Sequence, residues 1–170
     1  MLIYDPALDP YHSAVRILTI GLAAEARQGA ISVDAARIAD YFLVYPYKLR
    51  SFRFPMEFTA IRKAAAETDN PYRRSTGSRA AFERMRPIFF AALTGLVAAG
   101  LVDGEALKDG LISLSETELP ADLAAAASRF QERQTVVGRF VLSELLAMPS
   151  NGAGGLKDRS GLIEHRYDIA

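Results

Sequence analysis

The chain has 170 residues, of which half are apolar, and its 20 basic side chains are balanced by 20 acidic ones. This length and composition predict a globular domain with a buried core, and a zero net charge excludes a whole-molecule field that would attract DNA or membranes. The absence of cysteine excludes disulfides and thiolate sites, and two histidines are too few for a histidine-rich metal site. We expect no cofactor and no membrane contact. The first ten residues lack the pattern of a signal peptide, so we expect a cytoplasmic protein.

Helix signals dominate the first part of the chain. Asp9 is expected to cap a first helix, with a proline in its first turn. Apolar residues then recur at helical spacing until Gly29. Residues 30–32 are short enough to form a single edge strand. Ser32 is expected to cap a second helix, which must end near Tyr45 because the next residue is a proline.

The middle of the chain predicts three further helical segments. An irregular aromatic and basic stretch precedes a helix over residues 55–68. Ser78 is then expected to cap a short helix that ends or kinks at Pro87. Residues 87–102 contain no charged side chain, but a membrane span needs ~20 apolar residues. We therefore expect a buried core helix that ends at Gly100.

Two elements are expected after this helix. Residues 101–115 contain two short apolar segments around glycine-rich polar turns, a pattern typical of a small hairpin or wing. From Pro120 to about Met148, apolar residues recur on one face that is broken only by Gln134. One long helix is expected there, and it would reach ~40 Å.

This element order is that of a winged helix with an insertion between its second and third helices. We predict a mainly α domain over residues 1–148, with a winged-helix-like core, a small β-hairpin wing, an inserted helix and a long C-terminal helix. Residues 149–170 are expected to form a glycine-rich linker and an extended C-terminal docking arm.

Two segments of opposite charge lie within the neutral total. Residues 48–86 carry ten basic and four acidic side chains, whereas residues 101–128 carry one lysine and six acidic side chains. Such segments suit a protein that meets partners on several faces, although solvated surface is the simpler explanation. Weak, sequence-independent contact with DNA phosphates is a hypothesis for five of the basic residues. They are Lys48, Arg50, Arg53, Arg73 and Arg74.

The expected recognition helix argues against sequence-specific DNA binding. A helix that reads the major groove presents Arg, Lys, Asn or Gln to the bases. Within residues 87–100 the only polar side chain is that of Thr94. Protein contact is therefore the better use of the predicted fold.

Residues 155–168, GLKDRSGLIEHRYD, contain seven charged or histidine side chains. A phosphate loop is excluded because a leucine separates the glycine from the lysine. A hydrolase site is disfavoured because its candidate residues lie within eight positions of a terminal arm, without a nucleophile elbow. These candidates are Asp158, Ser160 and His165. We therefore predict that the chain is not an enzyme.

Docking on protein is the favoured role of this terminus. Its apolar residues alternate with basic ones, so it can be held against the chain's own core or against a partner. Within the chain, the acidic segment 101–128 is the candidate docking surface for the arm, and a disordered terminus is the alternative. The residues expected to dock are Leu156, Lys157, Arg159, Leu162, Ile163, Arg166 and Tyr167.

Four stretches, YDPALDPYHSAVRILTI, DYFLVYPYKLR, DNPYRR and GLKDRSGLIEHRYD, resemble the middle-component family of ABC-three-component systems. The resemblance implies a non-catalytic accessory subunit encoded with an SMC/Rad50-like ABC ATPase and an effector, in a Lamassu-like antiphage defence system. It implies that these two proteins are the partners, and it transfers no active site. The alternative functions are a winged-helix DNA-binding regulator and, more remotely, a small hydrolase.

Overall fold

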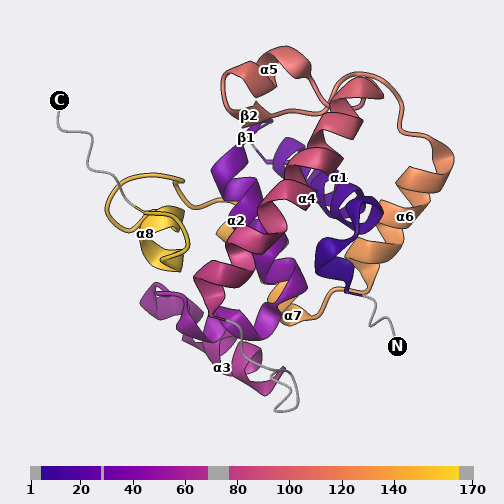
Figure 1. Ribbon diagram of the computed structural model, residues 1–170. Coiled ribbons are helices and arrows are strands. Elements are labelled where there is room, and N and C mark those ends of the chain that lie inside the picture. The colour runs from indigo at the N-terminus through magenta and orange to yellow at the C-terminus, as the bar shows by residue number, and fades with distance from the viewer. Residues whose placement is uncertain (1–4, 28, 69–76, 165–170) are drawn as a thin grey trace, which may run out of the picture.

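The computed structural model describes residues 5–27, 29–68 and 77–164. This part of the chain is mainly helical, with two short strands (Figure 1). In chain order the elements are η1 (Pro6–Leu8), α1 (Pro10–Glu25), β1 (Ile31–Ser32), α2 (Val33–Val44), η2 (Pro46–Ser51), η3 (Met56–Phe58), α3 (Thr59–Glu67), α4 (Ser78–Ala98), α5 (Gly104–Lys108), β2 (Leu111–Ile112), α6 (Ala121–Glu132), α7 (Val136–Phe140), a π-helical turn (Val141–Leu145) and α8 (Leu156–Ser160).

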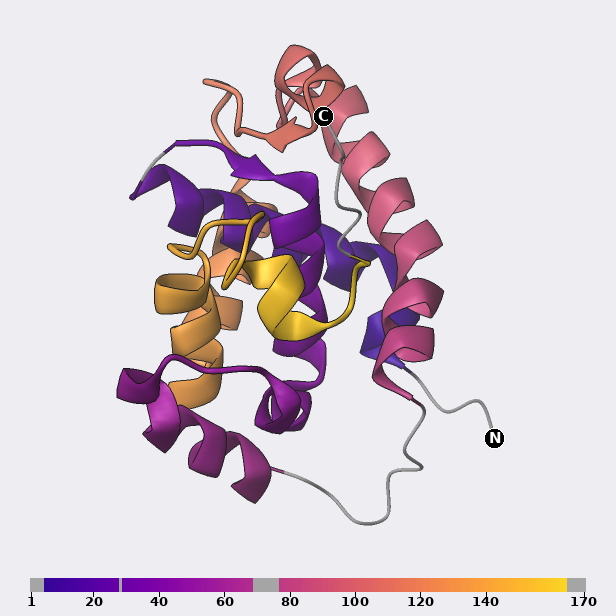
Figure 2. The same ribbon diagram turned by 90° about the vertical axis from the view of Figure 1, so that its left-hand side faces the viewer.

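Helix α2 is the central element. It contacts α1, α4, η2, the π-helical turn and α8, while α6 packs on α1 (Figures 1 and 2). Its residues from Ala35 to Leu43 are all buried, as expected for a helix that is surrounded by other elements. Ile38 and Tyr41 have no exposed surface and lie in the main core.

Local capping signals set the starts of the first two long helices, as predicted. The Asp9 carboxylate accepts hydrogen bonds from the backbone N–H groups of Tyr11 and His12, at 2.8 and 3.1 Å. The Ser32 hydroxyl accepts one from the N–H of Ala35 at 3.2 Å. Each bond satisfies an N–H group that has no partner within its own helix.

The predicted hairpin has a short helix at its tip. Val102 and Leu114 form an antiparallel bridge, and α5 lies between them in the chain. Strand β2 pairs in turn with β1, with Ile31 opposite Ile112. The segment after α5 therefore lies between the segment before α5 and the strand that precedes α2.

The prediction of a break at Pro87 is wrong, because α4 runs without interruption from Ser78 to Ala98. Proline removes the hydrogen bond to the carbonyl four residues earlier, here that of Glu83. Both residues are on the exposed side of α4, where water can satisfy this carbonyl. The cap is also one residue earlier than predicted, at Gly77.

The predicted long helix is instead two helices, α6 and α7, separated by residues 133–135. Two side chains specify this break. The amide of Gln134 donates to the Phe130 carbonyl at the end of α6, at 2.9 Å. The hydroxyl of Thr135 accepts from the Gly138 N–H at the start of α7, at 3.5 Å. The periodicity of apolar residues therefore continues across a bend.

The C-terminal segment is folded rather than extended. Residues 149–164 form tight turns around α8 and return over α2 (Figure 2). Gly152 and Gly154 have φ angles of 86° and 75°, which favour glycine. A Cβ atom on Gly155 would lie 2.4 Å from the Asn151 carbonyl oxygen, so this glycine permits a close backbone approach. The glycines predicted to make a flexible linker instead make a compact turn.

Candidate partner-docking surfaces

The described part of the arm is anchored in the main core by apolar side chains. Leu156 is 0% exposed and Leu162 is 2% exposed, and both belong to the main core cluster. Ile163 is partly buried against the same cluster. Full burial of a leucine side chain stabilises a fold by roughly 1.5–3 kcal/mol. The two leucines therefore tie the arm to the fold.

Charged side chains of the arm also find partners within the chain. Lys157 Nζ lies 2.6 Å from Asp34 Oδ2 on α2, and Arg53 Nη2 lies 2.8 Å from Asp158 Oδ1. Arg159 Nη1 donates to the Arg53 carbonyl at 2.6 Å, and the Arg53 N–H donates back to the Arg159 carbonyl at 3.0 Å. These partners are on α2 and just after η2, outside the acidic segment 101–128 that we considered as the docking surface of the arm.

The arm thus places five of its seven predicted docking residues on or beside its own core: Leu156, Lys157, Arg159, Leu162 and Ile163. The other two, Arg166 and Tyr167, lie outside the described residues. Glu164, which the sequence analysis did not name, pairs with Arg79 of α4 at 2.8 Å. Docking of the arm on a partner protein stays a prediction.

The basic residues proposed for DNA contact are used in different ways. Lys48 is 8% exposed, and its ammonium lies 5.5 Å from the centre of the Tyr47 ring. Arg53 is engaged by the arm, and both Arg50 and Arg53 are exposed. Arg73 and Arg74 lie outside the described residues. Two exposed cations on α3 are additional candidates that helical spacing within residues 55–68 could have identified. They are Arg62 and Lys63.

A buried ion pair joins α1 to α2. Arg16 Nε lies 2.5 Å from Asp40 Oδ1, and their side chains are 3% and 2% exposed. Arg16 Nη1 also donates to the Pro6 carbonyl at 3.0 Å, which ties η1 to the pair. Burial raises the pKa of Asp40 because it disfavours the charged form, and the Arg16 charge opposes this effect. Because the pair has so little access to solvent, we infer that its role is structural.

Arg37 forms a second buried charged contact, between α2 and α4. Its guanidinium lies 4.3 Å from the centre of the Phe82 ring, and Nη2 lies 3.6 Å from Glu83 Oε1. Burial lowers the pKa of Arg37, since the charged form loses solvation, while Glu83 opposes this shift. Cation–π contacts of this kind favour packing of one helix on another.

The candidate hydrolase residues of the arm stabilise its turns. Asp158 Oδ2 accepts from the Gly154 N–H at 3.0 Å, and the Ser160 hydroxyl donates to the Lys157 carbonyl at 3.4 Å. His165 lies outside the described residues. Over the ranges that the structure describes, no three His, Cys, Asp or Glu residues are grouped so as to hold a metal ion.

Helix α4 has one buried face and one exposed face, although its sequence led us to expect burial throughout. Phe89, Leu93 and Leu96 are buried in the core. Five residues at helical spacing are exposed on the other side, and we call them the outward face of α4. They are Pro87, Ala91, Thr94, Gly95 and Ala98. From Pro87 to Ala98 this face has no charged side chain, whereas the exposed residues one turn earlier, Glu83, Arg84 and Arg86, are charged.

Comparison with known proteins identifies a family. A family model described as ABC-three component (ABC-3C) system Middle Component 5 matches residues 2–168. No curated protein and no solved structure matches the chain. Among the helices that the structure describes, none combines the length and apolar character needed to cross a membrane. The match confirms the predicted family resemblance and spans nearly the whole sequence: the chain belongs to the ABC-three-component middle component 5 family, which implies an accessory role in a defence system.

Proposed function

We propose that the chain is a non-catalytic adaptor that joins an SMC/Rad50-like ABC ATPase to an effector within a cytoplasmic, Lamassu-like antiphage defence complex. Membership of a middle-component family supports assembly with other components. The observation that carries the proposal is the uncharged outward face of α4, from Pro87 to Ala98.

The order and pairing of elements support a winged-helix type of core. Helices α1, α2 and α4 would be its three helices, with α3 as an insertion between the second and the third. The Val102–Leu114 bridge and the pairing of β2 with β1 would form its small sheet and wing. In this arrangement α4 takes the position of the recognition helix, which contacts DNA in DNA-binding proteins of this type.

The chemistry of α4 favours a protein ligand in that position. Contact with DNA needs cations and side-chain amides directed at phosphates and base edges. On the outward face, Thr94 supplies the only polar side chain, and a Cβ atom added to Gly95 would meet nothing within 4 Å. Small side chains allow another helix to approach closely, and the absence of charge keeps the cost of desolvation low.

The test is reconstitution of the complex with the ATPase and the effector encoded beside this chain. Ala91→Arg should weaken binding of at least one of them at least about tenfold, equivalent to about 1.4 kcal/mol, because it places a charge in the contact. Ala66→Arg is the matched control, since Ala66 is an exposed alanine on α3. Full binding by Ala91→Arg and by Thr94→Arg would contradict the proposal.

The non-catalytic part of the proposal has a separate test. Asp158 and Ser160 make hydrogen bonds that stabilise the arm, which supports a structural role for both. The purified chain should hydrolyse neither ATP nor ester or phosphodiester substrates. Turnover that is lost in Ser160→Ala or His165→Ala would show that the arm is a hydrolase site.

The alternative is a winged-helix DNA-binding regulator. The same element order favours it, as do the exposed cations Arg50, Arg62 and Lys63. On the adaptor proposal, any DNA binding should be weak, independent of sequence and strongly weakened by salt. Tight, salt-tolerant binding to one palindromic operator would favour the regulator instead.

A further inference from the structure

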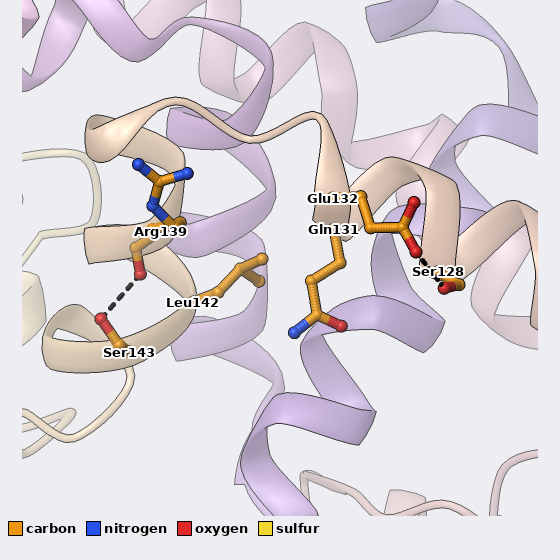
Figure 3. Close-up of a pocket in the computed structure, with 6 residues that line it drawn as sticks. All are labelled: Ser128, Gln131, Glu132, Arg139, Leu142 and Ser143. Atoms are coloured by element: carbon orange, nitrogen blue, oxygen red, sulfur yellow. Dashed lines mark hydrogen bonds between the residues drawn. The ribbon is translucent and has the colours of Figure 1, made fainter.

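A groove of about 670 Å³ opens between α6 and the segment formed by α7 and the π-helical turn (Figure 3). Three of its lining residues come from α6 and three from the other wall. They are Ser128, Gln131, Glu132, Arg139, Leu142 and Ser143. None of these residues belongs to α4 or to the arm, so the groove is distinct from the surfaces described above.

The bend between α6 and α7 creates this groove. In one continuous helix, the six lining residues would share a single stripe, since their spacing follows the helical period. The interruption at residues 133–135 folds that stripe, so that its two halves become opposite walls (Figure 3). Residues whose spacing would place them on one face of a helix therefore line a groove.

Specific contacts hold the bend in this form. Besides the cap on Phe130, Gln134 accepts a hydrogen bond at its carbonyl from Arg139 Nη1, at 2.9 Å. A Cβ atom on Gly138 would lie 2.1 Å from Gln134 Oε1, so the glycine makes room for the capping side chain. Leu142 and Ser143 lie in the π-helical turn, an uncommon conformation that is frequent at functional sites.

The two walls carry opposite charges that do not meet. Glu132 accepts a hydrogen bond from Ser128 at 2.9 Å, and Arg139 donates to the backbone of Gln134. Across residues 5–27, 29–68 and 77–164, no ion pair joins either of these side chains to another residue. Leu142, which is 7% exposed, provides an apolar surface between them. Within the described residues, therefore, neither Glu132 nor Arg139 is neutralised by an ion pair.

We propose that the groove receives a segment of a partner protein in which an apolar residue is flanked by a basic and an acidic residue. The basic residue would pair with Glu132, the acidic one with Arg139, and the apolar one would pack on Leu142. Charge pairs of this kind select and orient a partner segment. This inference rests on the proposed adaptor function and adds a second contact surface to it.

The experiment uses the full chain with the purified ATPase and effector, and measures the Kd of each complex. Glu132→Arg and Arg139→Glu should each weaken one of the two complexes at least about tenfold, because each creates a like-charge contact. Glu118→Arg and Arg129→Glu are matched charge reversals at exposed residues that do not line the groove. They should bind as the unmodified chain does. Glu132→Arg and both controls should keep its circular dichroism and melting temperature, whereas Arg139→Glu also removes the contact with the Gln134 carbonyl and should lower the melting temperature slightly.

A photo-crosslinker at Gln131 tests the chemistry of the occupant. The crosslinked peptide should come from the partner that the reversals affect, and it should contain the predicted basic and acidic residues. A peptide without them would overturn the inference, as would a dimer of this chain that Glu132→Arg dissociates.

Failure of the inference is distinct from failure of the proposed function. If the unmodified chain binds a partner and both groove reversals bind equally well, the groove inference is wrong and the adaptor function stands. If the unmodified chain binds neither protein, both are wrong.

Discussion

The arm and the outward face of α4 use their side chains in opposite ways. In the arm, leucines enter the core and charged groups pair with residues of α2 and of the segment after η2. On α4, a row of small, uncharged residues remains exposed. The number of charged residues in a segment is therefore a poor guide to its ability to bind a partner, because side chains that are already paired within the chain are less able to pair with another protein. On the adaptor proposal, the uncharged face is a surface that a partner would cover.

The largest effect on stability is expected when an apolar anchor of the arm is removed. Leu156→Ala should destabilise the protein by about 2–5 kcal/mol, because Leu156 is fully buried and its truncation leaves a cavity. The measurement is urea unfolding followed by circular dichroism. A loss below about 0.5 kcal/mol would mean that the arm is only loosely attached.

The packing of α2 on α4 can be tested by pH. Tyr41 lies on α2, which contacts α8, and its ring centre is 5.8 Å from that of Phe82 on α4. Burial raises the pKa of Tyr41 to about 12. In the unfolded chain it would titrate near about 10, so the unfolded state releases its proton first as pH rises. Stability should therefore fall by roughly 2 kcal/mol between about pH 10 and pH 12.

The matched variant for this pH dependence is Tyr41→Phe, which keeps the ring and removes the titrating group. Its unfolding free energy should lack this part of the decrease above about pH 10. An identical decrease in the variant would show that Tyr41 titrates normally and that its contact with α4 is open to solvent.

A smaller effect is expected from the ion pairs of the arm. Lys157 and Asp34 have side chains that are 20% and 38% exposed, so their attraction is screened by solvent. Lys157→Ala should cost at most about 1 kcal/mol, and less at high salt. A double-mutant cycle with Asp34→Ala isolates the pair. A coupling well above this value would mean that charge, rather than the leucines, holds the arm.

The smallest effect on stability is expected on the outward face of α4. Thr94→Ser should change the unfolding free energy by no more than about 0.5 kcal/mol, because Thr94 is exposed. Thermal unfolding at neutral pH is sufficient to check this. A large loss would indicate that the face already packs against the described chain, which would remove it as a partner surface.

Local sequence signals predicted much of the fold. Asp9 and Ser32 were identified as caps because each acts on residues two or three positions away. Whether Pro87 breaks α4 depended instead on which side of the helix faces solvent. The bend after α6 depended on contacts of Gln134 and Gly138 that a pattern of apolar residues does not contain. Periodicity alone therefore merged two helices into one.

The candidate site was harder to predict, because its contacts join distant parts of the chain. Leu156 and Leu162 were expected to be anchors from their apolar character, but the docking surface considered from the sequence, the acidic segment 101–128, does not supply the partners of Lys157 and Arg159. Arg53 and Asp158 are 105 residues apart in the chain. The groove residues between Ser128 and Ser143 lie in a stretch that was predicted as one long helix, so their opposition across a groove was not foreseen.

The sequence separation between the arm and the residues that it contacts also sets the order in which these parts fold during synthesis. During synthesis at roughly 5–20 residues per second, Asp158 is added about 5–20 s after Arg53. Until then the α2 surface that the arm covers is open, in a nascent chain whose earlier helices can already have formed. Leu156 and Leu162 therefore complete the core after the helices that precede them have been synthesised, and premature termination before Leu156 would leave apolar surface exposed to aggregation or to chaperones.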